Sequence, residues 1–470
     1  MEFIDRREEL KELERLHKIA GAKMVLVYGR RRVGKTRLLQ EFAKGKQVIF
    51  YTADARTEPD QLEEFGARVA EHLGPQAALA RFRSWPDALS YLMDELSRQR
   101  RKVVLILDEF PEITRQNHVV PSSLRAIWDR IENESSVMLI LSGSLVGEME
   151  RLARGREPLY GRFRGRLRLR PLDFSDASLF FPDRSFAERV EAYAVLGGMP
   201  AYLSIGADSP GIWETISDDI LNPRSILYEE VPFMLSQELR EPARYLSILR
   251  AIARGLTRPA QIGGATELKA QAVNTYLARM EHMDITGRMV PVTEKSPEKS
   301  RKGAYFIRDN FARFWMRFVL PNRYLVESGQ TPAVIENIRF AFPGFVSATW
   351  EEITRDAVRA RDASGELPLE LTRVGRYWDN NVEIDICGLG KKKDNYLWGE
   401  CQWRREKMGP EVLDNLKEKV ASAGFAGAGE HHYLLCSKSG FRAGLIERAR
   451  KENALLWDIG EVEAIVSDQR

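Results

Sequence analysis

Cysteine and histidine are scarce in this chain of 470 residues. The three cysteines, Cys387, Cys401 and Cys436, form no CxxC pair, and the six histidines include one adjacent pair, His431 and His432. These spacings exclude a zinc-finger pattern and a disulfide framework. Unpaired cysteines are typical of a protein from a reducing compartment. We interpret the two adjacent histidines as surface residues.

Long apolar runs are also absent. The most apolar late stretch, Phe311–Leu325, is interrupted by Arg313, Arg317 and Arg323, and no run approaches the roughly 20 residues that span a bilayer. The first residues show no basic-then-apolar signal pattern. We therefore expect a cytoplasmic protein with no membrane partner.

An excess of charge of one sign is missing as well. The net charge is +3, so any contact with nucleic acid must come from a local basic patch. Hydrophobic residues make up 44% and charged residues 30%, a composition typical of globular proteins. The length corresponds to about three domains.

A glycine-rich loop near the start carries the clearest motif. Met24–Tyr28 reads as a short buried strand, GRRRVGKT follows at Gly29–Thr36, and a helix begins directly afterwards. This order of strand, loop and helix is the context that a phosphate-binding loop requires. It predicts binding of ATP with Mg²⁺. The expected nucleotide contacts are Gly29, Arg30, Arg31, Arg32, Val33, Gly34, Lys35, Thr36 and Arg37.

The residue types in this loop match the chemistry. Gly29 and Gly34 let the backbone curl so that its N–H groups face phosphates. The positive end of the following helix adds to that field. Lys35 is expected to reach the β- and γ-phosphates, and Thr36 to give its hydroxyl to Mg²⁺.

A second apolar strand, Arg101–Phe110, runs into Asp108 and Glu109. Burying two carboxylates is costly unless they have a role, and the carboxyl end of a parallel strand faces the ligand crevice. We expect Asp108 to hold Mg²⁺ through water and Glu109 to polarise the attacking water. The predicted activity is slow hydrolysis of ATP.

Two further segments offer catalytic candidates. Val137–Ser144 predicts a third strand whose tip, Ser142 and less so Ser144, could sense the γ-phosphate or form a plain turn. Arg151–Arg170 holds eight arginines and one acidic residue. This composition suits an exposed edge strand or a phosphate-contacting surface. Arg162 is the best candidate for an arginine finger, which would act on a neighbouring subunit of a homo-oligomer or in cis.

These motifs resemble the archaeal-type P-loop ATPases, relatives of the AAA+ and STAND groups. The resemblance rests on the loop, the LILDEF strand, SGS, LYGR and GGMPAYL (Gly197–Leu203), and it reaches from Met1 to about Pro232. It implies that Lys35, Thr36, Asp108 and Glu109 bind nucleotide and magnesium. It also implies that FIDRREEL (Phe3–Leu10) lies near the adenine and GGMP in a helical lid. The predicted domains are an ATPase core over 1–175 and a lid over 176–235.

The middle of the chain, 236–330, predicts a winged helix. Arg244–Arg254 and Lys269–His282 have helical spacing, with a Pro- and Gly-containing break between them, and two strands are expected at Asp284–Val292 and Ala304–Ile307. Basic and amide side chains on the second helix suit duplex DNA. Winged helices also contact proteins, so both kinds of partner remain open.

The last part, 335–470, has its predicted start near Pro343-Gly344, followed by a helix over Val346–Arg361. A hairpin is expected from Val382–Leu389 and Tyr396–Trp403, with Asp385 and Glu400 on neighbouring strands, where paired carboxylates suit Mg²⁺ or Mn²⁺.

This part resembles the PD-(D/E)XK nuclease-like fold, and the resemblance implies that Glu351, Asp385 and Glu400 are its carboxylates. Gln402 stands where active members usually have lysine, which puts cleavage in doubt.

The predicted fold is therefore α/β and multidomain: a parallel-sheet ATPase core, a helical lid, a winged helix and a restriction-endonuclease-like domain. Two functions follow from it. The first is an ATP-driven switch that acts on DNA, with a nuclease-like tail that binds or cuts it. The alternative is a STAND-like signalling or assembly ATPase whose C-terminal domains contact a protein partner.

Overall fold

The computed structural model describes residues 4, 6–74, 81–99, 101–425 and 429–468. The chain divides into two compact units, Met1–Pro171 and Leu172–Arg470. This division falls close to the predicted end of the ATPase core at 175. The other predicted domain boundaries lie inside the second unit and stay predictions.

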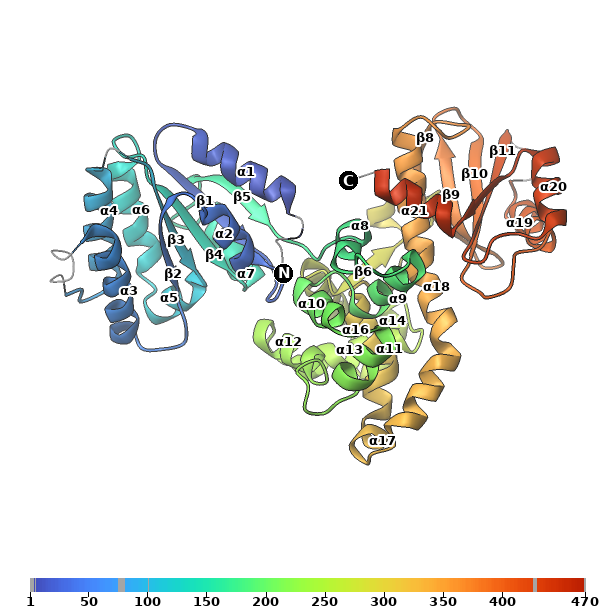
Figure 1. Cartoon of the computed structure of the whole chain (residues 1–470), viewed down its shortest axis with the longest axis horizontal. Helices are drawn as coiled ribbons and strands as arrows, with labels where there is room; N and C mark the ends of the chain where they lie inside the picture. The colour runs from blue at the N-terminus through green and yellow to red at the C-terminus, as the bar shows by residue number, and fades with distance from the viewer. Residues whose placement is uncertain (1–3, 5, 75–80, 100, 426–428, 469–470) are drawn as a thin grey trace. The chain divides into compact units, whose positions relative to one another are not determined.

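The first unit is built on a five-stranded sheet in the order β2-β3-β4-β1-β5, with all neighbouring strands parallel. Figure 1 shows helices on both faces of this sheet. The strands are β1 (Lys23–Tyr28), β2 (Gln47–Thr52), β3 (Val103–Asp108), β4 (Met138–Gly143) and β5 (Phe163–Arg168). The helices are α1 (Arg7–Lys18), α2 (Lys35–Ala43), α3 (Glu58–Leu73), α4 (Trp85–Ser97), α5 (Phe110–Gln116), α6 (Val120–Ile131) and α7 (Val146–Leu152). The parallel sheet predicted from the sequence is confirmed.

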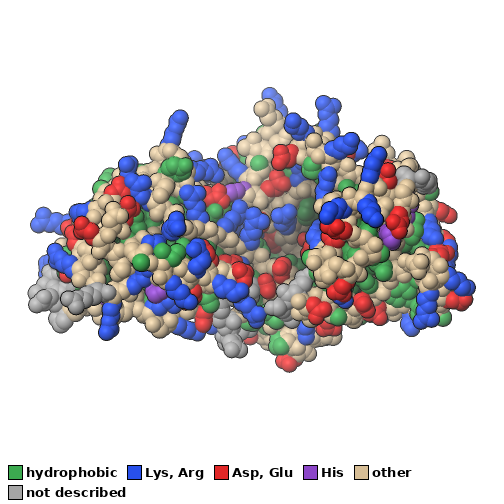
Figure 2. Space-filling model, turned by 90° about the horizontal axis from the view of Figure 1, so that it is seen from above, with side chains coloured by type: hydrophobic (Ala, Val, Ile, Leu, Met, Phe, Trp, Pro, Cys, Tyr) green, Lys and Arg blue, Asp and Glu red, His purple; other side chains and the backbone are tan. Residues whose placement is uncertain are grey.

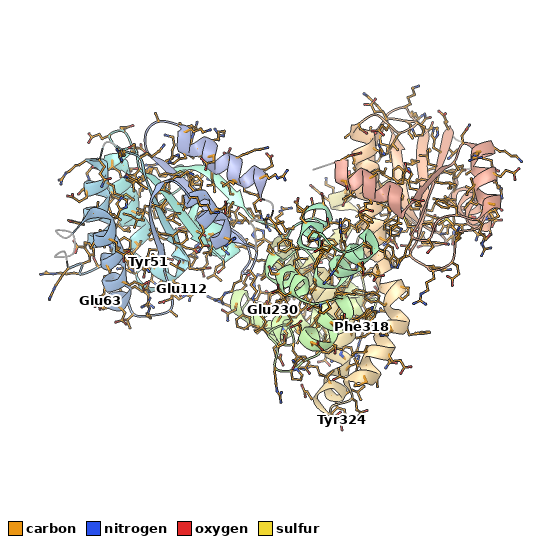
Figure 3. All side chains as sticks on the ribbon, in the orientation of Figure 1. Tyr51, Glu63, Glu112, Glu230, Phe318 and Tyr324 are labelled. Carbon is orange, nitrogen blue, oxygen red and sulfur yellow. The ribbon has the colours of Figure 1, made fainter. Side chains whose placement is uncertain are left out.

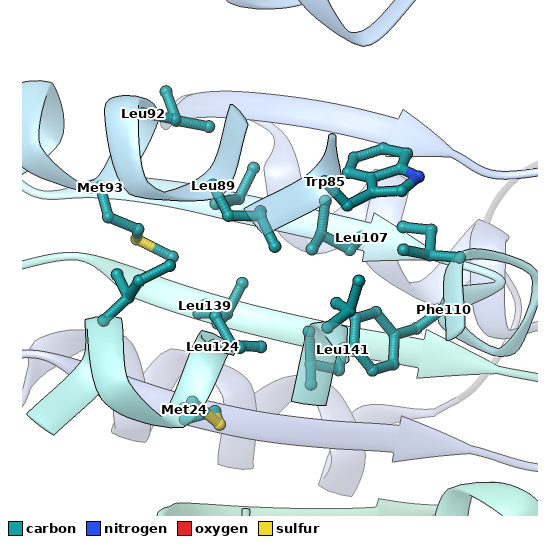
Figure 4. Packing of buried hydrophobic residues seen from close by; sticks show 14 of the residues in the cluster. Met24, Trp85, Leu89, Leu92, Met93, Leu107, Phe110, Leu124, Leu139 and Leu141 are labelled. Atoms are coloured by element: carbon teal, nitrogen blue, oxygen red, sulfur yellow. The ribbon is translucent and has the colours of Figure 1, made fainter. Parts of the chain in front are cut away.

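The core of this unit explains why its strands are so apolar. Each residue of β3 and β4 is buried, because a parallel sheet is covered on both faces. Trp85 and Leu89 of α4 pack against Leu107 of β3 and Leu141 of β4 (Figure 4). Tyr51, labelled in Figure 3, packs edge-on against Phe65 and near Trp85. β5 lies at the edge, as its alternating arginines indicate.

The second unit begins with a helical region. Its first elements are α8 (Phe174–Ala177), η2 (Ser178–Phe180), α9 (Phe186–Leu196), α10 (Pro200–Asp208), α11 (Ile212–Glu214), η3 (Thr215–Ile220) and α12 (Glu230–Glu238). The next are α13 (Pro242–Ala253), α14 (Pro259–Thr266), α15 (Ala270–His282), β6 (Thr286–Met289), η4 (Pro297–Lys299) and β7 (Ala304–Ile307). β6 and β7 form an antiparallel pair.

The segment TRPAQIGGAT was expected to interrupt the helical pattern, and that expectation is wrong. It contains α14, which starts at Pro259. Proline is favoured at the first helical position because its missing N–H has no partner there, so this proline begins a helix instead of ending one. The order of three helices and a hairpin agrees with the predicted winged helix, whose identity stays a prediction.

A long helix joins the helical region to the last sheet. The connecting elements are α16 (Asn310–Phe314), η5 (Trp315–Val319), η6 (Leu320–Asn322), α17 (Arg323–Glu327) and α18 (Thr331–Ala363). Tyr324 of α17 is 80% exposed and projects from the ribbon in Figure 3.

The break predicted at Pro343-Gly344 is wrong, because α18 runs through it. Pro343 and Gly344 lie on the exposed side of the helix, whereas Phe342 and Phe345 are buried. Pro343 cannot donate to the carbonyl four residues earlier, which belongs to the exposed Arg339, and the buried stripe continues on the other side of the helix.

The C-terminal sheet has the order β12-β11-β10-β9-β8 and mixes both strand directions: β8, β9 and β10 are antiparallel neighbours, and β10, β11 and β12 are parallel. Its strands are β8 (Leu371–Trp378), β9 (Glu383–Gly390), β10 (Asn395–Gln402), β11 (Glu430–Ser437) and β12 (Leu455–Asp458). The remaining helices are α19 (Glu411–Ser422), α20 (Ala443–Glu452) and α21 (Ile459–Asp468). The predicted β9–β10 hairpin is confirmed. Among the described residues, no helix is both long and apolar enough to cross a bilayer.

We expect that Gly198 in the GGMP turn cannot be replaced by a residue with a side chain without loss of stability. Gly198 O accepts a hydrogen bond from Leu172 N at 2.7 Å, and a Cβ on Gly198 would lie 1.8 Å from Leu172 O. Gly198→Ala is expected to lower the free energy of unfolding by about 1–3 kcal/mol through forced backbone movement. Thermal unfolding followed by circular dichroism measures the change.

The matched control is Gly264→Ala in α14, where a Cβ meets nothing within 4 Å. This change should stabilise by about 0.5–1 kcal/mol, because alanine is the better helix former. Equal unfolding midpoints for the two variants would contradict the contact at Gly198.

Candidate nucleotide-binding and carboxylate sites

The phosphate-binding loop connects β1 to α2, as predicted. Its nine expected contact residues, 29–37, form the loop and the first turn of α2. Gly34 has a φ of 95°, a left-handed conformation that glycine adopts without strain. Gly29 is held tightly, because a Cβ there would lie 2.3 Å from Leu169 O. These two glycines allow a loop closely packed on the backbone that follows β5.

Lys35 is positioned by the loop itself. Its Nζ donates to Gly29 O at 2.9 Å and to Arg30 O at 3.2 Å, and the residue is 5% exposed. The ammonium group therefore lies inside the curl of the loop. From there it can exchange carbonyl partners for phosphate oxygens without a change of backbone.

Thr36 and Asp108 meet across the carboxyl end of the sheet. Thr36 Oγ1 donates to Asp108 Oδ2 at 2.8 Å, and Glu109 N donates to Asp108 Oδ1 at 3.1 Å. Asp108 is 1% exposed, and no basic side chain of the described residues forms an ion pair with it. Burying a carboxylate is costly, and these two donors offset part of that cost. The hydroxyl and carboxylate oxygens at this point are the ligand types that Mg²⁺ prefers, so the residues fit the predicted ion.

The side chain of Glu109 is held by Ser144, the less favoured of the two candidates for sensing the γ-phosphate. Ser144 donates to Glu109 Oε2 through its backbone N at 3.0 Å and its Oγ at 2.8 Å. Glu109 has a φ of 53° and caps α5. Ser142, the preferred sensor candidate, is fully buried, and its Oγ has no hydrogen-bond partner. The structure therefore brings Ser144, rather than Ser142, to the carboxylate.

Arg162 is engaged elsewhere on the surface of the first unit. Its Nε and Nη2 donate to the two carboxylate oxygens of Asp129 at 2.6 and 3.0 Å. This fork lowers the pKa of Asp129. An arginine finger at this position would have to leave the Asp129 fork first.

Arg6 was not singled out from the sequence. Its Nη2 donates to Val33 O in the phosphate loop at 3.1 Å and to Arg170 O at 2.6 Å, and the residue is 7% exposed. It lies in the FIDRREEL segment, of which residues 3 and 5 are outside the described part of the chain. The local pattern of that segment shows a helix start but no sign of a contact 27 residues away.

A second candidate site consists of the three carboxylates on and beside the C-terminal sheet. Asp385 Oδ2 accepts from Cys401 N at 3.0 Å, which ties β9 to β10 beside Glu400. Burial and the nearby charge of Asp385 raise the pKa of Glu351 and of Glu400, each to about 7. The three predicted carboxylates are thus electrostatic neighbours. In the arrangement described, however, no three acidic, His or Cys side chains lie close enough together to hold a metal ion.

Cations that the sequence analysis missed surround these carboxylates. Lys419 Nζ of α19 lies 2.5 Å from Glu400 Oε1, and Arg376 and Arg355 lie 3.5 and 3.8 Å from Glu351. Gln402 ends β10 and occupies the position where lysine was expected. Arg355 follows Glu351 by one helical turn, a spacing visible in the sequence. Lys419 and Arg376 give no such local signal.

The link between Arg6 and the phosphate loop can be tested. Arg6→Ala removes a pair with Glu9 and two charge-assisted hydrogen bonds to backbone carbonyls, of which the one to Val33 supports the loop. At about 1.5–3 kcal/mol for a hydrogen bond to a charged group, the dissociation constant for ATP should rise about tenfold or more. Isothermal titration with ATP and Mg²⁺ measures it.

Lys11→Ala is the control for that experiment. Lys11 lies in α1, the helix that Arg6 precedes, and forms only an exposed pair with Glu8. Its loss should leave ATP affinity unchanged, since exposed pairs contribute little. An Arg6→Ala protein that binds ATP as tightly as the Lys11→Ala protein would remove Arg6 from the site.

Two segments of the chain match known protein families. Residues 3–205 match a family described as an ATPase domain predominantly from Archaea, and residues 315–416 match a family of archaeal and bacterial proteins of unknown function. An uncharacterized protein of Methanocaldococcus jannaschii is 29% identical over 460 residues, covering 97% of this chain and 99% of that protein.

Solved structures resemble this chain over about two thirds of its length, among them the following two. The Walker-type ATPase of Pyrococcus abyssi has 21% identity and a TM-score of 0.47, covering 67% of this chain and 96% of that one. The ORC2 protein of Aeropyrum pernix has 14% identity and a TM-score of 0.45, covering 69% and 94%. The family match over residues 3–205, together with the loop that those residues contain, supports a P-loop ATPase.

Proposed function

We propose that this chain is an ATP-hydrolysing switch protein that acts on DNA. The observation that carries the ATPase part is the connected set Thr36–Asp108–Glu109–Ser144 beside the phosphate loop. A hydroxyl, a buried carboxylate and a second, oriented carboxylate are the groups that phosphoryl transfer from ATP to water requires.

Each residue has a role in this proposal. Lys35 exchanges its carbonyl partners for the β- and γ-phosphates, and the N-terminus of α2 favours their negative charge. Thr36 and Asp108 would hold Mg²⁺, which neutralises charge that develops on the phosphates. Glu109 orients the attacking water and accepts its proton, while Ser144 keeps the carboxylate in position through its two hydrogen bonds.

The DNA part of the proposal rests on the second unit. The helices α13 to α15 and the β6–β7 hairpin have the order expected of a winged helix, and the wing residues between the two strands are rich in lysine and arginine. We propose that this module contacts duplex DNA. The C-terminal sheet with α18 is proposed as a nuclease-like domain that binds DNA without rapid cleavage, since Gln402 replaces the lysine and the carboxylates form no three-ligand group.

The alternative function is a signalling or assembly ATPase whose C-terminal region contacts a protein. Basic and acidic side chains are interspersed over both ends of the space-filling view, which favours this alternative over a broad DNA-binding field (Figure 2). The salt dependence of duplex binding separates the two, because phosphate contacts give a steep fall of affinity with salt. Duplex affinity that does not change with salt concentration would rule out action on DNA and favour the signalling or assembly ATPase.

Glu109→Gln tests the catalytic assignment. Glutamine keeps the size and can still accept from Ser144, but it cannot take a proton from water. ATP should bind with unchanged affinity, while turnover falls by about 10²–10⁴-fold, the usual contribution of a general base. Steady-state phosphate release and ATP titration measure the two quantities.

Glu112→Gln is the matched control. Glu112, labelled in Figure 3, lies one turn further along α5 and pairs with Arg115 at the surface. Its turnover should equal that of the unaltered protein. A Glu109→Gln protein that turns over ATP as fast as the Glu112→Gln protein would refute Glu109 as the base.

A further inference from the structure

The second unit contains a cavity of about 440 Å³ whose lining includes no residue of the phosphate loop. It is formed by α13, β7, α16 with its continuation η5, and the middle of α18, with β8 at one side. Its volume is within the range of small-ligand sites. Six arginines line it against three carboxylates: Arg308, Arg313, Arg317, Arg355, Arg359 and Arg376 against Glu351, Glu352 and Asp356.

The carboxylates neutralise only part of this set. Glu351 pairs with Arg355 and Arg376, and Asp356 pairs with Arg359. Arg308 lies 3.8 Å from Asp284. For Arg313 and Arg317, no carboxylate of the described residues comes within ion-pair distance. The cavity therefore carries an excess of positive charge that its own walls do not balance.

Two arginines of the cavity, Arg313 and Arg376, have a buried Nε without a hydrogen-bond partner, and Arg313 is the one that also lacks an ion pair. Its Nη2 donates to Thr349 Oγ1 at 2.7 Å and its guanidinium lies 4.6 Å from the centre of the Phe345 ring, but its Nε is buried without a hydrogen-bond partner. Burial lowers the pKa of Arg313 to about 10, so the group remains charged at neutral pH. A buried donor that is left unpaired is costly, and an anion in the cavity would remove that cost.

The walls between the arginines are apolar and aromatic. Tyr305 and Phe306 of β7 and Phe345 of α18 line the cavity, and Arg317 lies over the ring of Phe318 (labelled in Figure 3). Aromatic faces accept nucleobases by stacking, while arginines accept phosphates. This mixture is unlike a site for a bare inorganic anion.

A second hollow of about 570 Å³ shares Arg355, Arg359 and Arg376 with the first and adds Arg288 and Arg373. The arginine-lined surface is thus longer than one phosphate group. Such a series suits successive phosphates of a strand better than a single mononucleotide.

We propose that this arginine pocket binds the phosphate of a nucleotide unit within a single nucleic-acid strand, with the base against the aromatic wall. The pocket shares no lining residue with the phosphate loop or with α15, and Glu351 is part of its wall. It therefore adds a strand-binding position to the proposed action on DNA without depending on ATP hydrolysis.

Strand binding is measured in full-length protein that carries Lys35→Ala, so that the phosphate loop does not contribute. The probe is a fluorescein-labelled single strand of about ten nucleotides, followed by anisotropy at several salt concentrations. Arg313→Gln and Arg317→Gln are compared with Arg450→Gln. Arg450 is an exposed arginine of α20 outside the cavity. Arg317 is exposed, so its replacement leaves the fold intact even if Arg313→Gln is destabilised.

Each pocket variant should weaken strand binding about tenfold, the effect of losing one charge-assisted hydrogen bond, and should lower the salt slope by about one. Arg450→Gln should change neither. If the Arg317→Gln protein binds the strand as tightly as the Arg450→Gln protein, the proposal is overturned, whether neither variant loses affinity or both lose it equally. Adenosine monophosphate and inorganic phosphate serve as competitors.

The competitors identify the source of the phosphate. Weak competition by adenosine monophosphate supports a strand. Competition by adenosine monophosphate at the strand's own concentration would instead overturn the strand assignment in favour of a free nucleotide. The absence of strand binding in the Lys35→Ala protein would overturn the pocket, yet leave the ATPase proposal untouched, because that proposal is tested by turnover.

Discussion

A carboxylate buried at the end of an apolar strand is the constraint on which the first unit depends. Asp108 is almost completely buried, and both of its oxygens are occupied by local donors, Thr36 and the backbone of Glu109. Hydrogen bonds from neutral donors offset part of the cost of burying that charge, and a divalent cation would offset the rest. The oxygens of Asp108 are of the type that Mg²⁺ prefers, which agrees with the role proposed for this residue.

The geometry around Asp108 links distant parts of the sequence. The sheet brings the loop after β1 next to the ends of β3 and β4, so Thr36, Asp108 and Ser144 meet although they are far apart along the chain. Arg6 adds the start of the chain and the backbone after β5 to the same loop. Arg6 therefore links the phosphate loop to the backbone of Arg170.

The second unit has a comparable excess charge of the opposite sign. Arg313 and Arg317 face a cavity without carboxylate partners, whereas the neighbouring arginines are paired with Glu351 and Asp356. Asp108 thus belongs to the proposed magnesium site, and Arg313 belongs to the proposed strand-binding pocket.

Sequence patterns predicted the features that depend on neighbours in the chain. The strands before Gly29 and at Asp108, the parallel sheet and the β9–β10 hairpin all follow from runs of apolar residues and their flanks. Long-range contacts had no such pattern: the bond from Arg6 to Val33, the pairing of Lys419 with Glu400, and the Asp129 fork that holds Arg162. Two helix breaks predicted from proline, at Pro259 and Pro343, were wrong. The effect of proline on a helix depends on its position and on which face of the helix is exposed.

The central claim is that ATP turnover at the phosphate loop is coupled to DNA. Its most direct test is the steady-state rate of ATP hydrolysis with and without duplex DNA, with the Lys35→Ala protein as the blank. The account predicts slow turnover that rises when DNA is added and vanishes in the variant. Tight ATP binding with turnover that is indifferent to DNA would contradict it and would favour a protein partner instead.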